Sequence, residues 1–400
     1  MSKQHSQRAL MLTILLISLI QMPQYAILPA TDYISTVVFP KFSIQTIQTV
    51  MSLPAIISVF AGIISAMLVR FGLSTKKSLT IAGLTFIALT GLISAMSHSE
   101  FWHLCLLNAL IGTGMGAFIP NIQSIIFDNF DEKTRQLITG IQFSFINIGG
   151  IILTLLCGFL TATIWYGGHL VMLVAIPVII TACIIIPQDK KIKPSNHNGD
   201  LKTKLPVQIY FYASLIIVYM ILFNVSTVNI STHLTEGQIG DSSTAGIVTA
   251  LLMAGGVFSG FIFPKISQTL RDYALSVSFL ILTAGFTLMN LFPESLVITL
   301  AAMFLSGTTM GIFIPRCLFC VSNLSNPSNS ATATMLVCSV APGVGSFMSP
   351  IIITNLTLTL GNDSTRYRFQ FTAVLCFIAS IVLFLYNIRK NKKIKLGTVG

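Results

Sequence analysis

Apolar residues fill twelve long runs along the chain, separated by short polar segments. The runs lie near residues 9–30, 44–68, 78–97, 103–126, 137–160, 169–187, 207–231, 243–264, 273–292, 296–320, 331–357 and 369–388. Each run is long enough to cross a bilayer as a helix, which takes about 20 apolar residues. None alternates with the two-residue period of a membrane β-strand. The pattern predicts an all-α membrane protein with 12 transmembrane helices.

The composition excludes a water-soluble protein of this length. Hydrophobic residues make up 54% of the 400 residues and charged residues only 9%, whereas an average soluble chain is about 25% charged. The first apolar run follows Lys3 and Arg8 as the core of a signal peptide would. It is longer than such a core and eleven further runs follow, so we expect an uncleaved first helix.

The net charge of +11 reflects the orientation in the membrane. Twelve spans place both termini on one side, and 19 of the 23 Lys and Arg residues lie in the termini and loops of that side. Lys41, Arg366 and Arg368 fall on the other side, and Arg316 falls within a span. Because Lys and Arg accumulate in cytoplasmic loops, we expect cytoplasmic termini in a multi-pass protein of the cell membrane. Because orientation in the membrane accounts for the basic charge, we expect no nucleic-acid partner.

An internal repeat divides the chain into two similar halves. Residues 112–120 read GTGMGAFIP and residues 307–315 read GTTMGIFIP, at an offset of 195 residues. The offset contains six spans, an even number, so both copies cross the membrane in the same direction. We therefore predict two parallel, pseudo-symmetric six-helix bundles, 1–187 and 207–400, the second ending in a short basic tail. A polar cytoplasmic linker, 188–206, connects them.

These features resemble the major facilitator superfamily (MFS) over essentially the whole chain. The segment from Ser65 to Gly72, with Arg70 and the following Lys76 and Lys77, is similar to the cytoplasmic signature between helices 2 and 3, although Val69 replaces its acid. Asp131 to Arg135, followed by Gly140, resembles the loop between helices 4 and 5. Two signatures of drug exporters are degraded, at Asn108 and at Phe145–Gly150. The resemblance implies the MFS fold and a secondary transporter that works by alternating access.

Arg316 is the clearest ionisable residue within a predicted span. Such a residue is a functional candidate because its burial is costly. Its repeat mate is Asn121, and the resemblance implies that helices 1, 4, 7 and 10 line a central cavity which both residues face. A guanidinium can hold a carboxylate or phosphate through two hydrogen bonds. Alternatively, Arg316 bonds backbone carbonyls near Pro315 or extends to the cytoplasmic face.

Other polar residues within the spans are candidates for substrate binding or proton coupling. Further substrate-binding candidates are Gln24, Tyr25, Gln142, Asn147, Asn224 and Asn229, some of which could instead bond neighbouring helices. Asp32, beyond Pro29 at the outer end of the first helix, is the candidate for proton coupling. A solvated helix-end acid is the alternative for it. His103, His169 and His233 near outer helix ends are weaker candidates.

Glycines and prolines mark candidate positions for gating and helix packing. Glycine allows close helix contact, and proline within a helix removes a backbone hydrogen bond. The candidates, with the basic signature residues, are Arg70, Gly72, Lys76, Gly112, Gly116, Pro120, Gly307, Gly311, Pro315, Pro342 and Pro350. The seven cysteines all fall within spans, and we interpret the Cys317–Cys320 pair as packing residues, not as a metal or redox site.

The sequence thus predicts a transporter and not an enzyme. It contains no P-loop and no clustered catalytic motif, so we expect no cofactor and no metal. We expect a monomer that moves a small organic solute together with H⁺, with export favoured because it is common in the superfamily. Uptake of an organic anion bound by Arg316, and uncoupled facilitated diffusion, remain the alternatives.

Overall fold

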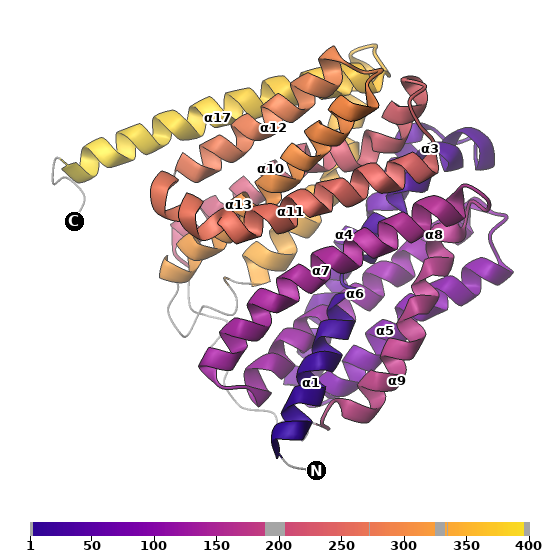
Figure 1. Ribbon diagram of the computed structural model, residues 1–400, viewed down its shortest axis with the longest axis vertical. Helices are drawn as coiled ribbons and strands as arrows, with labels where there is room; N and C mark the ends of the chain where they lie inside the picture. The colour runs from indigo at the N-terminus through magenta and orange to yellow at the C-terminus, as the bar shows by residue number, and fades with distance from the viewer. Residues whose placement is uncertain (1–2, 189–204, 272, 325–332, 334, 396–400) are drawn as a thin grey trace. The chain divides into compact units, whose positions relative to one another are not determined.

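The computed structural model describes residues 3–188, 205–271, 273–324, 333 and 335–395, and these residues are almost entirely helical (Figure 1). Twelve helical segments of the described chain are long and apolar enough to cross a membrane, and they coincide with the twelve apolar runs. Large apolar side chains such as Phe60, Phe159 and Phe261 are more than half exposed, as expected of surfaces that face lipid tails. The predicted all-α membrane fold is confirmed.

The helices form two compact units. The first comprises Met1–Lys202 with Asp241–Ala250, and the second comprises Thr203–Gly240 with Leu251–Gly400. The first unit takes in the start of the eighth span because Gly246 packs there against Thr154 and Gly158. Most of the predicted linker, residues 189–204, lies outside the described residues, so the proposed division at 188–206 stays a prediction.

The first unit is built around α6, which packs against both α4 and α5 (Figure 1). A Cβ at Gly112 would lie 2.7 Å from the carbonyl oxygen of Pro54, and one at Gly114 would lie 2.6 Å from that of Gly83. Glycine is therefore required where these backbones meet. The helices of this unit are α1 (Lys3–Ser18), α2 (Pro23–Ala26), η1 (Leu28–Ala30), α3 (Thr31–Tyr33), η2 (Ile34–Val38), α4 (Ile44–Arg70), α5 (Lys76–Met96), α6 (Phe101–Asn129), α7 (Glu132–Thr161), α8 (Gly167–Leu170), η3 (Val171–Val174), α9 (Ala175–Ile185) and the beginning of α11 (Ser242–Leu270).

The first span is broken into short helical pieces after Ser18. Proline has no N–H and disfavours helical geometry in the residue before it. Met22, before Pro23, accordingly has φ −120° and ψ 46°, and α2 begins at Pro23. The break places Gln21 and Gln24 where the backbone is not continuously helical.

The second unit contains an unbroken α10 and a segmented eleventh span. Pro342 and Pro350 divide that span into alternating π-helical and α-helical pieces, whereas α13 continues through Pro315. The helices of this unit are α10 (Val207–Glu236), the remainder of α11, α12 (Tyr273–Leu291), α13 (Leu296–Leu324), η4 (Leu336–Val340), α15 (Ala341–Ser349), η5 (Pro350–Thr354), α16 (Asn355–Thr359) and α17 (Thr365–Lys395).

Gly72 ends α4 in a left-handed backbone conformation, with φ 68°. The N–H of Leu73 bonds the carbonyl of Leu68, and the N–H of Gly72 bonds that of Val69. These two bonds satisfy carbonyls that the last turn of a helix leaves open, and the geometry favours glycine. The structure thus gives Gly72 a local role as the residue that terminates α4.

Asp241 caps the N-terminus of α11, and this contact predicts a pH-dependent contribution to stability. Its carboxylate accepts the N–H of Thr244 at 2.9 Å, which lowers the pKa of Asp241 below its ordinary value of 3.8. The cap should therefore contribute fully above pH 3.8 and be lost as the pH falls through the lowered pKa. We expect Asp241→Ala to cost about 1 kcal/mol at neutral pH.

The matched control is Asp241→Asn, which keeps a capping oxygen without a titratable group. Thermal unfolding of the purified protein, followed from neutral to acid pH, measures both variants. Equal stability of Asp241→Ala and wild type at neutral pH would contradict the prediction.

Candidate functional site

In the first unit, Asn121, Gln142 and Asn147, which we predicted to bind substrate, form hydrogen bonds with other residues of the protein. Asn121 on α6 donates to the hydroxyl of Ser65 on α4 at 2.7 Å. Gln123, two residues further along α6, donates to Oε1 of Gln142 on α7 at 3.1 Å. Asn147 donates to the carbonyl of Phe143 in its own helix. Asn121 and Asn147 therefore have partners within the protein.

Four buried amide atoms in this unit lack a hydrogen-bond partner among the described residues. They are Nε2 of Gln21, Oε1 of Gln24, Oδ1 of Asn108 and Nε2 of Gln142. A buried polar group left unpaired costs about 1–3 kcal/mol. These atoms are thus available to a water molecule or a bound solute. Tyr25, adjacent to Gln24, is buried as well.

The amides do not form one cluster. Gly149 of α7 packs on Leu19, and Gly168, which follows α7, lies near both Ile27 and Cys157, so the first span and α7 run in parallel. Gln142 precedes Gly149 by seven residues, about 10 Å along a helix, whereas Gln24 lies beyond Leu19 in the opposite direction. The sequence grouped Gln24 and Gln142 together, and the structure separates them along the span.

Arg316 in the second unit is 7% exposed and contacts side chains of its own unit. Its Nη1 donates to the hydroxyl of Ser267 on α11 at 3.0 Å, and its guanidinium lies 5.3 Å from the ring centre of Phe319. These contacts fix the guanidinium between α11 and α13. They are compatible with either a structural role or the binding of an anion.

The two asparagines of α10 differ in their partners. Asn224 donates to the hydroxyl of Ser346 at 3.1 Å and so links α10 to α15. Gly345, beside Ser346, lets the same two helices approach closely, because a Cβ there would lie 2.7 Å from the carbonyl oxygen of Ile217. Asn229 instead accepts a hydrogen bond from Nη1 of Arg368 on α17 at 2.9 Å.

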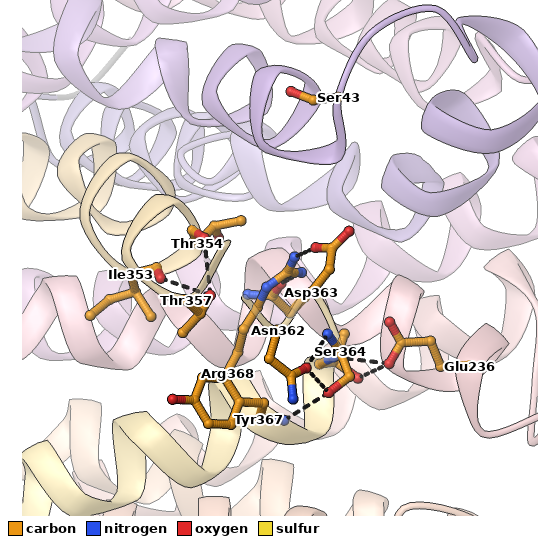
Figure 2. Close-up of polar contacts among 12 residues, drawn as sticks. Ser43, Glu236, Ile353, Thr354, Thr357, Asn362, Asp363, Ser364, Tyr367 and Arg368 are labelled. Carbon is orange, nitrogen blue, oxygen red and sulfur yellow. Dashed lines mark hydrogen bonds and ion pairs between the residues drawn. The ribbon is translucent and has the colours of Figure 1, made fainter. Parts of the chain in front are cut away.

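Arg368 is a charge whose burial the sequence analysis did not predict. We placed it before the last apolar run, whereas α17 begins at Thr365 and includes Arg368, which is 0% exposed. It forms an ion pair with Asp363 in the turn before α17. Figure 2 shows Arg368 beside Asp363, with Glu236 of α10 on the other side of Ser364. Arg316 is thus one of at least two buried arginines in the spans.

The same end of the second unit brings together a buried histidine and an exposed carboxylate. Glu236 accepts the N–H of Thr365 at 2.9 Å and its hydroxyl at 2.6 Å. The hydroxyl of Thr365 lies 3.5 Å from Nδ1 of His233. We define the α10–α17 polar cluster as Asn229, His233, Glu236, Thr299, Asp363, Thr365 and Arg368.

Asp32, the predicted coupling residue, lies in α3 and is buried. Its backbone carbonyl accepts the hydroxyls of Ser35 and Thr36, both at 2.9 Å. It occupies the first unit, whereas the α10–α17 polar cluster belongs to the second. The coupling role of Asp32 stays a prediction.

The basic signature between α4 and α5 has a carboxylate partner from α6. Lys76 forms an ion pair with Asp128. The sequence analysis found no acid in this signature, because Val69 replaces the usual one, and it did not identify Asp128 as a partner of Lys76. Arg70 is the last residue of α4, and its side chain lies outside the described residues.

Glycines of α13 show the same close packing against α11 as those of α6 show against α4. A Cβ at Gly307 would lie 2.7 Å from the carbonyl carbon of Leu252, and one at Gly311 would lie 2.8 Å from the carbonyl oxygen of Gly256. Gly116 in α6 meets Gly62 in the same manner, at 2.7 Å from its N. Pro120 lies within α6, which continues past it to Asn129. A gating role for these positions stays a prediction.

Metal ligands are not gathered in the part of the chain that the structure describes. No group of three or more His, Cys, Asp or Glu side chains there could hold a metal ion. The described cysteines are free thiols. The polar chemistry of the described spans comprises hydrogen-bonding amides and hydroxyls, buried histidines and a few buried charges.

Comparison with known proteins gives this arrangement a family. The model of the Major Facilitator Superfamily matches residues 10–350. No curated protein matches the chain.

Solved transporter structures share the fold. The POT family transporter PepTSo has 12% sequence identity and a TM-score of 0.75, with 96% of this chain and 99% of that one covered. The nucleoside transporter NupG has 15% identity and a TM-score of 0.71, covering 95% and 98%. A bacterial homologue of the human lysosomal transporter Spinster has 16% identity and a TM-score of 0.68, covering 96% of both. The chain belongs to the Major Facilitator Superfamily, and it is a membrane transporter, not an enzyme.

Proposed function

We propose that the protein is a proton-coupled secondary transporter that moves a small organic solute across the cytoplasmic membrane by alternating access, as a monomer. Export is the proposed direction. The observation that carries the proposal is the presence of buried amide atoms without a protein partner, namely Nε2 of Gln21, Oε1 of Gln24 and Nε2 of Gln142, inside a chain of this superfamily.

The amides favour a solute with hydrogen-bonding groups. Each unpartnered amide costs about 1–3 kcal/mol when buried, and a solute that pairs with it recovers that free energy. An amide offers both a donor and an acceptor but no charge. A polar, uncharged group of the solute therefore fits each of these positions, and because Gln24 and Gln142 are separated along the span, different groups of the solute would meet them.

The first experiment is a thermal-shift screen of the purified, full-length protein. The ligands are organic anions, neutral sugars and nucleosides, and lipophilic cations. A ligand at 100 times its Kd should stabilise the protein by about 2.7 kcal/mol. Flux of a stabilising ligand into proteoliposomes, with and without an imposed pH gradient, then tests direction and coupling. Flux that ignores the gradient would contradict proton coupling and favour a facilitator.

The alternative function is uptake of an organic anion at Arg316. The buried guanidinium between α11 and α13 favours it. If Arg316 holds the anion through two hydrogen bonds, Arg316→Ala should abolish the stabilisation by organic anions, and Arg316→Lys should retain part of it because only the charge remains.

The control for this prediction is Ser267→Ala, which removes the hydroxyl that Arg316 contacts but keeps the guanidinium and its contact with Phe319. Stabilisation by the anion should survive in this variant. Equal stabilisation of wild type and Arg316→Ala would exclude anion binding at Arg316.

A further inference from the structure

We propose that His233 is a proton-binding site in the second unit, reached from the exposed carboxylate of Glu236 through the hydroxyl of Thr365. The inference deepens the proposed function, since it names a proton acceptor for the coupling suggested above. It concerns α10, α13 and α17 alone, all in the second unit.

Four side chains form a continuous chain of polar contacts. Oε2 of Glu236 accepts the hydroxyl of Thr365 at 2.6 Å. That hydroxyl oxygen lies 3.5 Å from Nδ1 of His233, and Nε2 of His233 lies 3.3 Å from the hydroxyl of Thr299. The chain thus leads from the end of α10, across the start of α17, to the first turn of α13.

Exposure falls along this chain. Glu236 is exposed, whereas Thr365 and His233 are each 1% exposed and Thr299 is 0% exposed. Water can reach the carboxylate but not the imidazole. The ring of Phe369 packs against His233 at a centroid distance of 5.1 Å and closes that side. A proton bound for His233 therefore has Glu236 and Thr365 as its route.

The proposed step transfers one proton and no electrons. A proton from water binds the carboxylate of Glu236. The resulting acid donates to the oxygen of Thr365 while the hydroxyl of Thr365 gives its own proton to Nδ1 of His233. The carboxylate of Glu236 is regenerated, Thr365 is again a hydroxyl, and His233 is an imidazolium whose second N–H points at Thr299. A hydroxyl can relay in this manner because it both donates and accepts.

The end of α10 favours the imidazolium, and the start of α17 favours the carboxylate, although Glu236 is also the last residue of α10. His233 lies in the last turn of α10, where the partial negative charge of the helix end stabilises a cation. Glu236 accepts the backbone N–H of Thr365 at the start of α17, where the partial positive charge stabilises an anion. The imidazolium and the carboxylate face each other through one hydroxyl.

Other charged groups lie near this chain of polar contacts. Asp363 stands on the turn before α17, and Arg366 and Arg368 stand in the first turn of α17. Arg368 pairs with Asp363, and Arg366 donates to the carbonyl of Asn290 at the end of α12. Glu294 lies in the turn between α12 and α13, next to Pro293, whose carbonyl approaches Gly237. Arg368 also interacts with the charge of Glu236, and the polar side chains that directly face His233 are Thr365 and Thr299.

The test follows the protonation of His233 directly and uses no solute. The full-length protein contains six histidines and is labelled with ¹³C in the imidazole rings. The signal that disappears in His233→Gln is assigned to His233, and its shift is followed from about pH 3 to 8, which extends below the ordinary range of histidine because the ring is buried.

The informative variants remove or retain the hydroxyl of residue 365. Thr365→Val removes both the relay and the oxygen that would accept a hydrogen bond from Nδ1–H of the imidazolium, so it should lower the proton affinity. It keeps the size of the side chain, and Thr365→Ser restores the hydroxyl. Thr372→Val is the matched control, because Thr372 is a buried threonine of the same helix whose hydroxyl bonds only the carbonyl of Arg368. Glu236→Gln removes the counter-charge and serves if Thr365→Val does not fold.

We expect Thr365→Val and Glu236→Gln each to lower the proton affinity of His233 about tenfold, a shift of about one pH unit. Thr365→Ser and Thr372→Val should titrate as wild type does. A His233 signal that does not shift across this range overturns the proposal. So do equal titrations of wild type, Glu236→Gln and Thr365→Val.

Coupling to transport is a separate outcome. With a solute from the ligand screen, Thr365→Val should lose accumulation driven by a pH gradient while retaining exchange of labelled for unlabelled solute at equal pH. Equal gradient-driven accumulation by wild type and Thr365→Val would overturn the coupling role of His233. The titration above does not depend on transport, so failure of the proposed function leaves it measurable.

Discussion

We expect Gly307→Ala to lower the free energy of unfolding by about 3 kcal/mol, at the upper end of overpacking effects. A Cβ at this position would overlap the backbone carbonyl of Leu252, lying 2.7 Å from its carbon and closer still to its oxygen. A backbone atom in the middle of α11 cannot move aside as the end of a flexible side chain can. The two helices would have to separate along much of their contact.

The matched control is Gly62→Ala, a glycine within a helix of the first unit. A Cβ there would lie 3.6 Å from the nearest atom, the carbonyl oxygen of Gly116, which is ordinary contact. Because alanine favours helix over glycine by about 1 kcal/mol, Gly62→Ala should be neutral or stabilising. Thermal unfolding in detergent measures both variants. A Gly307→Ala protein as stable as Gly62→Ala would show that α11 and α13 can separate without cost.

The sequence predicted the spans and the close-packing glycines because both follow from local rules. A bilayer requires about 20 apolar residues per helix, so the pattern of long apolar runs locates the spans. The repeat at Gly112 and Gly307 marked the two helices in which a glycine faces a neighbouring backbone. Such positions can be recognised in the sequence because only glycine fits them.

Side-chain partners could not be predicted, since they depend on which residues meet across helices. Gln123 donates to Gln142, and Asp128 pairs with Lys76, although nothing in the spacing of these residues indicates it. The break after Ser18 was also missed, although Pro23 and Pro29 were a signal for it. The start of α17 was placed after Arg368, and the sequence Asn362-Asp363-Ser364, rich in residues that cap helices, could have moved it forward.

We expect Asn229→Ala to cost about 3 kcal/mol, because it removes the oxygen that faces the buried guanidinium of Arg368. Hydrogen bonds to charged groups contribute about 1.5–3 kcal/mol, and a buried charge left without its partner costs more. Nη1 of Arg368 donates to Asn229 at 2.9 Å, and Nε of Arg368 has no partner among the described residues. The guanidinium would lose a partner that neither lipid nor an apolar side chain replaces.

The cost should depend on the charge, and Arg368→Met tests this dependence. In that background Asn229→Ala should cost only about 1 kcal/mol, since no charge is left unpaired. The non-additivity of about 2 kcal/mol measures the interaction of the pair. Asn224→Ala is the control: Asn224 is a buried asparagine of the same helix, bonded to Ser346 and not to Arg368. Its cost should be the same in both backgrounds. If Asn229→Ala also cost the same in both, the hydrogen bond to Arg368 would contribute nothing, and the buried charge would be held by Asp363 alone.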